Sequence, residues 1–104
     1  MTTQRNAYDR LSMYKTAIYT KDAITYIVYH QTDIVQFTYD LITLDHGGYR
    51  TVTTKKKMNQ ASHQFNLGYS VIQRKGVWYA DYNGKLYNFD AAPLTFERPK
   101  TLAA

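Results

Sequence analysis

Two dipeptides in the last third of the chain, Lys75-Gly76 and Asn83-Gly84, constrain the fold more than any other feature. Each separates two short runs of alternating side chains, and Asn-Gly is the strongest short-range signal for a two-residue β-hairpin loop. Counting outward from both loops predicts a three-stranded antiparallel meander in which the paired residues are Gln73 with Trp78, Val71 with Ala80, Tyr69 with Tyr82, Ala80 with Tyr87 and Trp78 with Phe89. The apolar face of this meander is then predicted to hold Tyr69, Val71, Trp78, Ala80, Tyr82, Tyr87 and Phe89.

The first half of the chain also has the pattern of strands. Residues 14–20 and 23–31 flank a turn at Lys21-Asp22, and residues 33–39 and 41–44 follow as one bent strand or two short ones. Residues 45–48, Asp-His-Gly-Gly, predict a turn. The segment after Pro93 is predicted to be at most an edge strand, because proline cannot donate to a sheet.

One segment has the period of a helix. Met58, Ala61, Ser62 and Phe65 recur at the spacing of one helix face over residues 54–65. Thr53 or Thr54 is the expected N-cap, and Asn66 or Gly68 the expected left-handed residue at the end. Its polar face is expected to carry Lys55, Lys56, Asn59 and His63.

These elements predict an α+β fold in a single domain of residues 1–104. An antiparallel sheet of six or seven strands, with the meander at its C-terminal end, is expected to carry the helix on one face through Met58 and Phe65. Residues 1–12 and 98–104 are expected to be loosely ordered, since chain ends lack partners.

Composition narrows the classes of function. The chain has no cysteine, so disulfides, thiolate zinc sites and thiol catalysis are excluded. No apolar run approaches the length of a membrane span, so no membrane partner is expected. A net charge of +5 and a pI near 9.4 favour nucleic acid, nucleotides or acidic protein surfaces as partners.

Three consecutive lysines near the predicted helix start suggest an anion site. With Thr53 or Thr54 as N-cap, Lys55, Lys56 and Lys57 would fall in the first turn, where the helix dipole disfavours cations by about 0.3–1 kcal/mol each. A bound phosphate would offset this cost, since main-chain N–H groups, hydroxyls and an arginine fork all bind phosphate. The predicted phosphate site over residues 47–57 and nearby comprises Tyr49, Arg50, Thr51, Thr53, Thr54, Lys55, Lys56 and Asn59. The simpler interpretation is a threonine cap, a packed tyrosine and solvated lysines.

Parts of the chain resemble a group of small, uncharacterised proteins from tailed bacteriophages. The resemblance rests on HQTDIVQF at 30–37, GGYRTVTT at 47–54 followed by MNQ at 58–60, and GYSVIQRKGVWY at 68–79. It covers about residues 25–89 and implies no activity. What it implies is a phage accessory product that acts in the cytoplasm of the infected bacterium, where such proteins bind host factors or signalling molecules.

No catalytic constellation is present in the sequence. His30, His46 and His63 fall on a predicted strand end, a turn and the helix, and no hydrolase, zinc-protease or P-loop motif occurs. A metal joining His30 or His46 to Asp33 or Asp45 lacks any supporting spacing. We therefore expect no enzyme, no metal site and no cofactor.

Two functions remain open. The first is a non-enzymatic protein that binds a phosphate-bearing ligand, either a nucleotide signal of host defence or single-stranded nucleic acid. The alternative is a protein-interaction or virion component, in which strand edges and the eleven tyrosines form homo-oligomers or bind a host protein.

Overall fold

The computed structural model describes residue 13 and residues 15–98, and it confirms the α+β class. The expectation of loose ends at 1–12 and 99–104 lies outside these residues. The described strands are β1 (Thr16–Lys21), β2 (Ile24–Tyr29), β3 (Thr32–Phe37), β4 (Leu41–Leu44), β5 (Ser70–Arg74), β6 (Val77–Tyr82), β7 (Lys85–Asn88) and β8 (Leu94–Glu97). The helix α1 spans Val52–Gln64.

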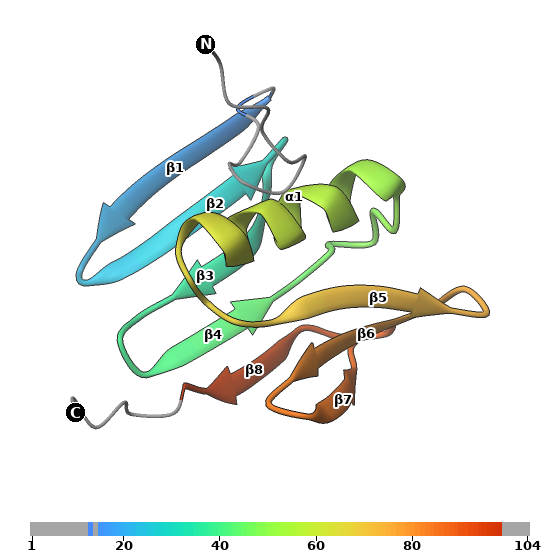
Figure 1. The fold of residues 1–104 in the computed structure, drawn as a ribbon. Coiled ribbons are helices and arrows are strands. Elements are labelled where there is room, and N and C mark those ends of the chain that lie inside the picture. Colours follow the sequence, from blue (N-terminus) through green and yellow to red (C-terminus); the bar gives the residue numbers. More distant parts are fainter. Residues whose placement is uncertain (1–12, 14, 99–104) are drawn as a thin grey trace, which may run out of the picture.

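The strands form two antiparallel sheets where the sequence predicted one (Figure 1). One sheet has the order β1-β2-β3-β4-β8, and the other has the order β5-β6-β7. The predicted antiparallel α+β fold with a C-terminal meander and one helix is confirmed, but its eight strands are divided between two sheets: the meander β5-β6-β7 forms one sheet, and β8 pairs with β4 in the other. Helix α1 and the whole three-stranded sheet separate these two strands in the sequence, and a local pattern contains no signal for such a pairing. The prediction that the segment after Pro93 forms an edge strand is confirmed.

The registers read from the two hairpin loops are confirmed. Gln73 pairs with Trp78, and Val71 and Tyr87 both pair with Ala80. Asn83 and Gly84 both have positive φ, at 52° and 78°, as a two-residue hairpin loop of this hand requires.

Strand boundaries in the first half differ from the prediction by one or two residues. The first hairpin turns at Asp22-Ala23, both at positive φ, so Lys21 belongs to β1 and the predicted turn at Lys21-Asp22 was displaced by one residue. Residues 33–44 form two strands, because the Thr38 hydroxyl accepts from the N–H groups of Asp40 and Leu41 and holds a turn.

Helix α1 starts earlier than predicted. Thr51 is the N-cap, and its hydroxyl oxygen accepts a hydrogen bond from the N–H of Thr54 at 3.1 Å. The predicted caps, Thr53 and Thr54, lie inside the first turn. At the other end Asn66 and Gly68 both adopt positive φ, so both residues proposed to end the helix take the left-handed conformation.

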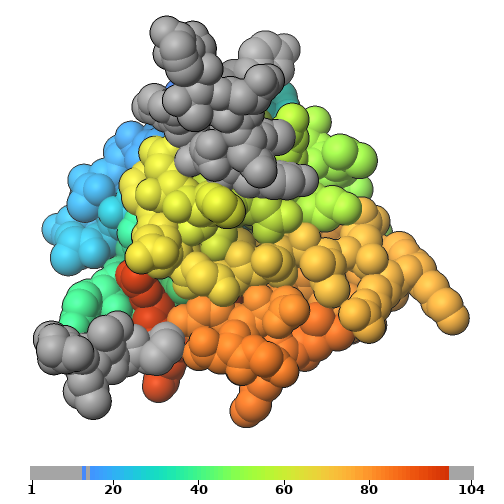
Figure 2. Space-filling view, viewed as in Figure 1, coloured from blue at the N-terminus to red at the C-terminus, as the bar shows by residue number. Residues whose placement is uncertain are grey.

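The helix covers β2 and β3 of the five-stranded sheet and lies beside β5 of the three-stranded sheet, so that all three contribute to one core (Figures 1 and 2). Met58 is fully buried, as predicted, but Phe65 packs on Phe37 of the five-stranded sheet, with ring centroids 5.2 Å apart. Phe96 of β8 packs on Tyr82 of the three-stranded sheet, with ring centroids 4.3 Å apart. The apolar face predicted for the meander is confirmed: its residues are buried or packed against the core.

Side chains of α1 occupy the outer edge of β5. The Asn59 amide donates to the carbonyl oxygen of Val71 at 3.1 Å and accepts from the Val71 N–H at 2.7 Å. One turn further, the Ser62 hydroxyl donates to the carbonyl of Tyr69 at 2.7 Å and accepts from its N–H at 3.0 Å. The prediction that Asn59 lies on the outward polar face was wrong, because its amide bonds to the main chain of β5 where a neighbouring strand is missing.

Arg98 is also well fixed, although it was expected to belong to a loose terminus. Its N–H donates to the carbonyl of Asp40 at 2.8 Å, and its guanidinium donates to the carbonyl of Thr38 at 2.7 Å. These bonds connect the end of β8 to the turn between β3 and β4.

Candidate functional site

The predicted phosphate-binding stretch begins in a tight loop after β4. Asp45 accepts from the N–H of Gly47 at 2.8 Å, and the carbonyl of His46 accepts from the N–H of Tyr49 at 2.8 Å. Gly47 has a φ of 61°, and a Cβ at this position would lie 2.6 Å from the Thr32 methyl carbon. Glycine is therefore required here by both backbone conformation and space, and the loop lies directly against the β2–β3 turn.

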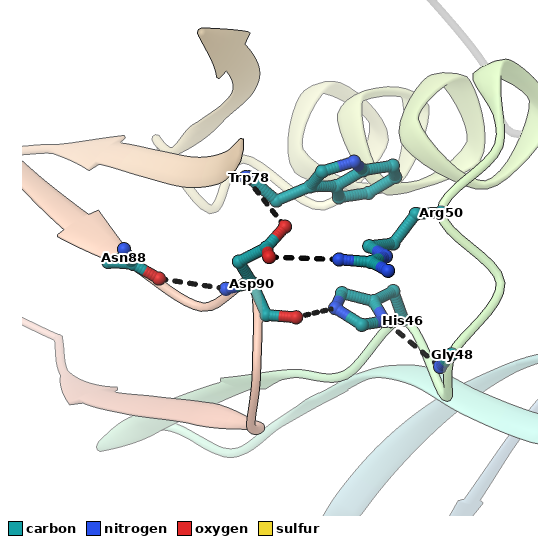
Figure 3. Close-up of polar contacts among 6 residues, drawn as sticks. All are labelled: His46, Gly48, Arg50, Trp78, Asn88 and Asp90. Carbon is teal, nitrogen blue, oxygen red and sulfur yellow. Dashed lines mark hydrogen bonds and ion pairs between the residues drawn. The ribbon is translucent and has the colours of Figure 1, made fainter. Parts of the chain in front are cut away.

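His46 connects this loop to the three-stranded sheet (Figure 3). Its Nδ1 accepts from the N–H of Gly48 at 2.9 Å, so the proton of the neutral ring is on Nε2, which donates to the carbonyl of Asp90 at 2.8 Å. The ring is only 8% exposed and packs against Trp78 and Phe89. Its surroundings indicate a structural role.

Arg50 forms an ion pair with Asp90. Its guanidinium donates to one carboxylate oxygen at 2.8 Å, and the other oxygen accepts from the main-chain N–H of Trp78 at 3.1 Å (Figure 3). Burial by itself raises the pKa of the Asp90 carboxyl. The hydrogen bond from Trp78 and the hydrogen bond and charge of Arg50 lower it by more, so the pKa lies below its ordinary value. The arginine proposed to grip a phosphate thus holds a carboxylate of its own chain.

The lysines lie two or three residues further from the helix start than predicted. Because Thr51 is the cap, residues 52–54 fill the first turn, and the dipole argument for an anion loses most of its force there. The ammonium of Lys55 donates to the side-chain oxygen of Gln73 at 3.3 Å, and Lys56 is exposed. Lys57 is only 2% exposed, with its ammonium 5.0 Å from the ring centroid of Tyr29. Burial, and then the charge of Lys56, lower the pKa of Lys57.

Two neighbouring residues of the predicted site line different hollows. Tyr49 lines a groove of about 560 Å³ between the β2–β3 turn and the start of α1, called here the turn–helix groove. Arg50 lines a separate hollow of about 540 Å³ beside Asp90. Tyr49 and Arg50 therefore do not contribute to one common pocket. Among the described residues, the turn–helix groove is lined by Tyr29, His30, Gln31, Thr32, Tyr49, Thr51 and Thr54.

The structure thus divides the predicted site residues. Three of them (Tyr49, Thr51 and Thr54) share the turn–helix groove; the other five, Arg50, Thr53, Lys55, Lys56 and Asn59, are not among its lining residues. The four groove residues from the β2–β3 turn were not predicted as site residues. A polar pair, His30-Gln31, ends an apolar strand, and this signal for a turn was available in the sequence.

The described lining of the groove offers stacking and hydrogen-bonding groups and contains no carboxylate. Tyr49 is 58% exposed, and Tyr29 packs against His30 with ring centroids 4.3 Å apart. The Thr51 hydroxyl donates to the Thr54 hydroxyl oxygen at 3.1 Å; Thr51 is exposed, whereas Thr54 is fully buried behind it. No acidic residue lies in the first turn of α1, so the helix N-terminus keeps its positive potential.

Metal coordination finds no support in the described part of the chain. Among residues 13 and 15–98, no three histidine or acidic side chains come close enough together to hold an ion. The described region also contains no helix with the length and apolar character needed to cross a bilayer.

Fold and groove together define a small α+β protein in which one helix joins two antiparallel sheets and its N-terminus opens into a cleft. Residues 1–100 match the family described as Kyanoviridae Gp96 protein, and the chain belongs to this family of phage proteins. The resemblance to phage proteins drawn from the sequence is thereby confirmed at the level of a phage protein family. The searches of curated proteins and of solved structures each found no match.

Proposed function

We propose that this phage protein binds a phosphate-bearing ligand of nucleotide size in the turn–helix groove, without catalysing a reaction on it. The observation that carries the proposal is that Tyr49, Thr51 and Thr54 line one groove together with Tyr29 and His30. Aromatic rings stack on bases, and hydroxyls with a helix N-terminus bind phosphate oxygens. The proposed site differs from the one drawn from the sequence, because Arg50 no longer belongs to it.

The size of the groove favours a compact nucleotide over an extended strand. Its volume of about 560 Å³ falls within the roughly 300–1,000 Å³ of small-molecule sites. Extended nucleic acid would need aromatic and basic side chains along a longer path, and its affinity would fall steeply with salt. In the infected bacterium such a ligand would be a nucleotide signal that the protein removes from solution.

The test is calorimetric titration of the purified chain with mononucleotides, cyclic dinucleotides and a short oligonucleotide at low and high salt. Tyr49→Ala should weaken nucleotide binding about tenfold or more, since base stacking contributes roughly 1–3 kcal/mol. Tyr39→Ala is the matched control, because Tyr39 is 74% exposed and lies outside the groove. Arg50→Ala should leave binding nearly unchanged. No heat from any nucleotide, or equal binding by Tyr49→Ala, would contradict the proposal.

A second candidate function, a protein-interaction or virion component, is favoured by large apolar side chains at the surface. Among the described residues, Tyr19, Tyr39, Leu41, Val52 and Leu86 are each more than 40% exposed without lining the groove. Mass spectrometry of purified virions separates the candidates, since a virion component would be present at a fixed copy number and a nucleotide-binding accessory protein would be absent.

A further inference from the structure

The edges of the two sheets differ in how they are protected. Asn59 and Ser62 occupy the edge of β5, while β7 and β8 are four residues long and carry Lys85 and Glu97. Strand β1 has six residues, contains no proline, and is largely exposed. Long, regular edge strands of this kind are the ones that pair with another chain. Strand β1 is therefore the edge best suited to pair with another chain.

The turn between β1 and β2 determines which main-chain groups of β1 point outward. In a two-residue hairpin the flanking residues, Lys21 and Ile24, form a hydrogen-bonded pair, and such pairs then alternate along the ladder. The N–H and C=O groups of Thr16, Ile18 and Thr20 consequently point away from β2. The N–H of Thr16 donates to the carbonyl of Met13, outside β2, at 3.1 Å, which agrees with an outward direction for the main-chain groups of Thr16.

Ile18 and Thr20 form an open, self-complementary edge. Among the described residues, their outward main-chain groups have no hydrogen-bond partner. A donor–acceptor set spaced two residues apart is satisfied by an identical antiparallel strand, in which Ile18 of one copy faces Thr20 of the other. We propose that two copies of this chain associate through β1 about a two-fold axis that passes beside Tyr19. This surface is independent of the turn–helix groove.

The side chains of β1 support this register. Tyr19 is 45% exposed and stacks on Tyr26 of β2, with centroids 4.8 Å apart and planes at 16°. On the two-fold axis the two Tyr19 rings become a directly opposed, non-hydrogen-bonded pair, which is the closer of the two kinds of cross-strand pair. The existing stack then continues from one copy to the other as a row of four tyrosines.

Charges fit the same register. Two Lys21 residues would lie about 14 Å apart, because each faces Ala17 of the other copy four residues from its equivalent. Asp22 of one copy lies opposite Thr16 of the other, next to Lys15, so opposite charges meet at both ends. Like charges are thus separated and unlike charges are adjacent.

Cysteine crosslinking tests both the pairing and its register, because the natural chain contains no cysteine. Tyr19→Cys places two sulfur atoms across the axis at Cα separations of about 4.5–5.5 Å, within the range of a disulfide. Lys21→Cys is the matched control on the same strand and the same face, with its two copies about 14 Å apart. Under mild oxidation Tyr19→Cys should become mostly dimeric, while Lys21→Cys stays mostly monomeric. Equal crosslinking of both variants would overturn the proposed register.

Light scattering tests the association itself. The unmodified chain, of 12.1 kDa, should show twice that mass at tens of micromolar and dissociate on dilution. Tyr19→Glu should be monomeric at the same concentration, because two carboxylates would face each other across the axis. Tyr39→Glu introduces the same change at an exposed tyrosine away from β1 and should remain dimeric. A monomeric natural chain at these concentrations, or dimeric Tyr19→Glu, would refute the proposal.

Discussion

Replacing Asn59 by alanine removes the side chain that pairs with the edge of β5. Two hydrogen bonds are lost, one to each main-chain group of Val71. Each contributes roughly 0.5–1.5 kcal/mol net, so the free energy of unfolding should fall by about 1–3 kcal/mol. At about 2 kcal/mol the melting temperature would drop by roughly 8–16 °C in a domain of this size.

Urea unfolding followed by the fluorescence of Trp78, the single tryptophan, measures this loss. Hydrogen exchange at the Val71 amide provides the local measurement and should become faster in the variant. His63→Ala is the control, because His63 is exposed on the same helix and should change stability by less than about 0.5 kcal/mol.

Unchanged stability together with unchanged protection of the Val71 amide would refute the edge-pairing role of Asn59. If Asn59→Ala instead lost nucleotide binding while keeping full stability, Asn59 would be a ligand residue, as the sequence first suggested.

Three further predictions concern the loop and the helix start. Gly47→Ala should cost about 2–4 kcal/mol in unfolding free energy, since positive φ and a Cβ 2.6 Å from a threonine methyl both oppose it; Gly48→Ala, with positive φ and no atom within 4 Å, should cost clearly less in the same urea titration. Thr51→Ala should cost about 1 kcal/mol through loss of the N-cap, measured by thermal unfolding. The pKa of Asp90 is lowered in the fold, so its stabilising contribution is complete above the ordinary value of 3.8 and is lost as pH falls through the lower folded value. Arg50→Ala should therefore make the free energy of unfolding below pH 4 less dependent on pH. An unchanged acid-unfolding curve would contradict this.

Local signals in the sequence determined much of this fold. Asn83-Gly84 and Lys75-Gly76 specify turns whose geometry admits one register, so the register of the meander followed directly, and the pairs Gln73–Trp78, Val71–Ala80 and Ala80–Tyr87 are confirmed. The helix could be placed because its apolar period extends over three turns. Its start was predicted at Thr53 or Thr54 and lies at Thr51; all three threonines have a hydroxyl that can cap a helix, and the folded backbone selects Thr51.

The candidate site depended on contacts that no local pattern encodes. Tyr49, Thr51 and Thr54 were named from the sequence, but their groove is completed by the β2–β3 turn, which the loop approaches closely where Gly47 lies against Thr32. Arg50 is withdrawn from the groove by Asp90, forty residues later in the chain. The sequence by itself determined the elements and their amphipathic faces, since these depend on near neighbours. Tertiary structure alone decided the division into two sheets, the partner of β4 and the surroundings of each polar side chain, because these depend on which distant segments pack together.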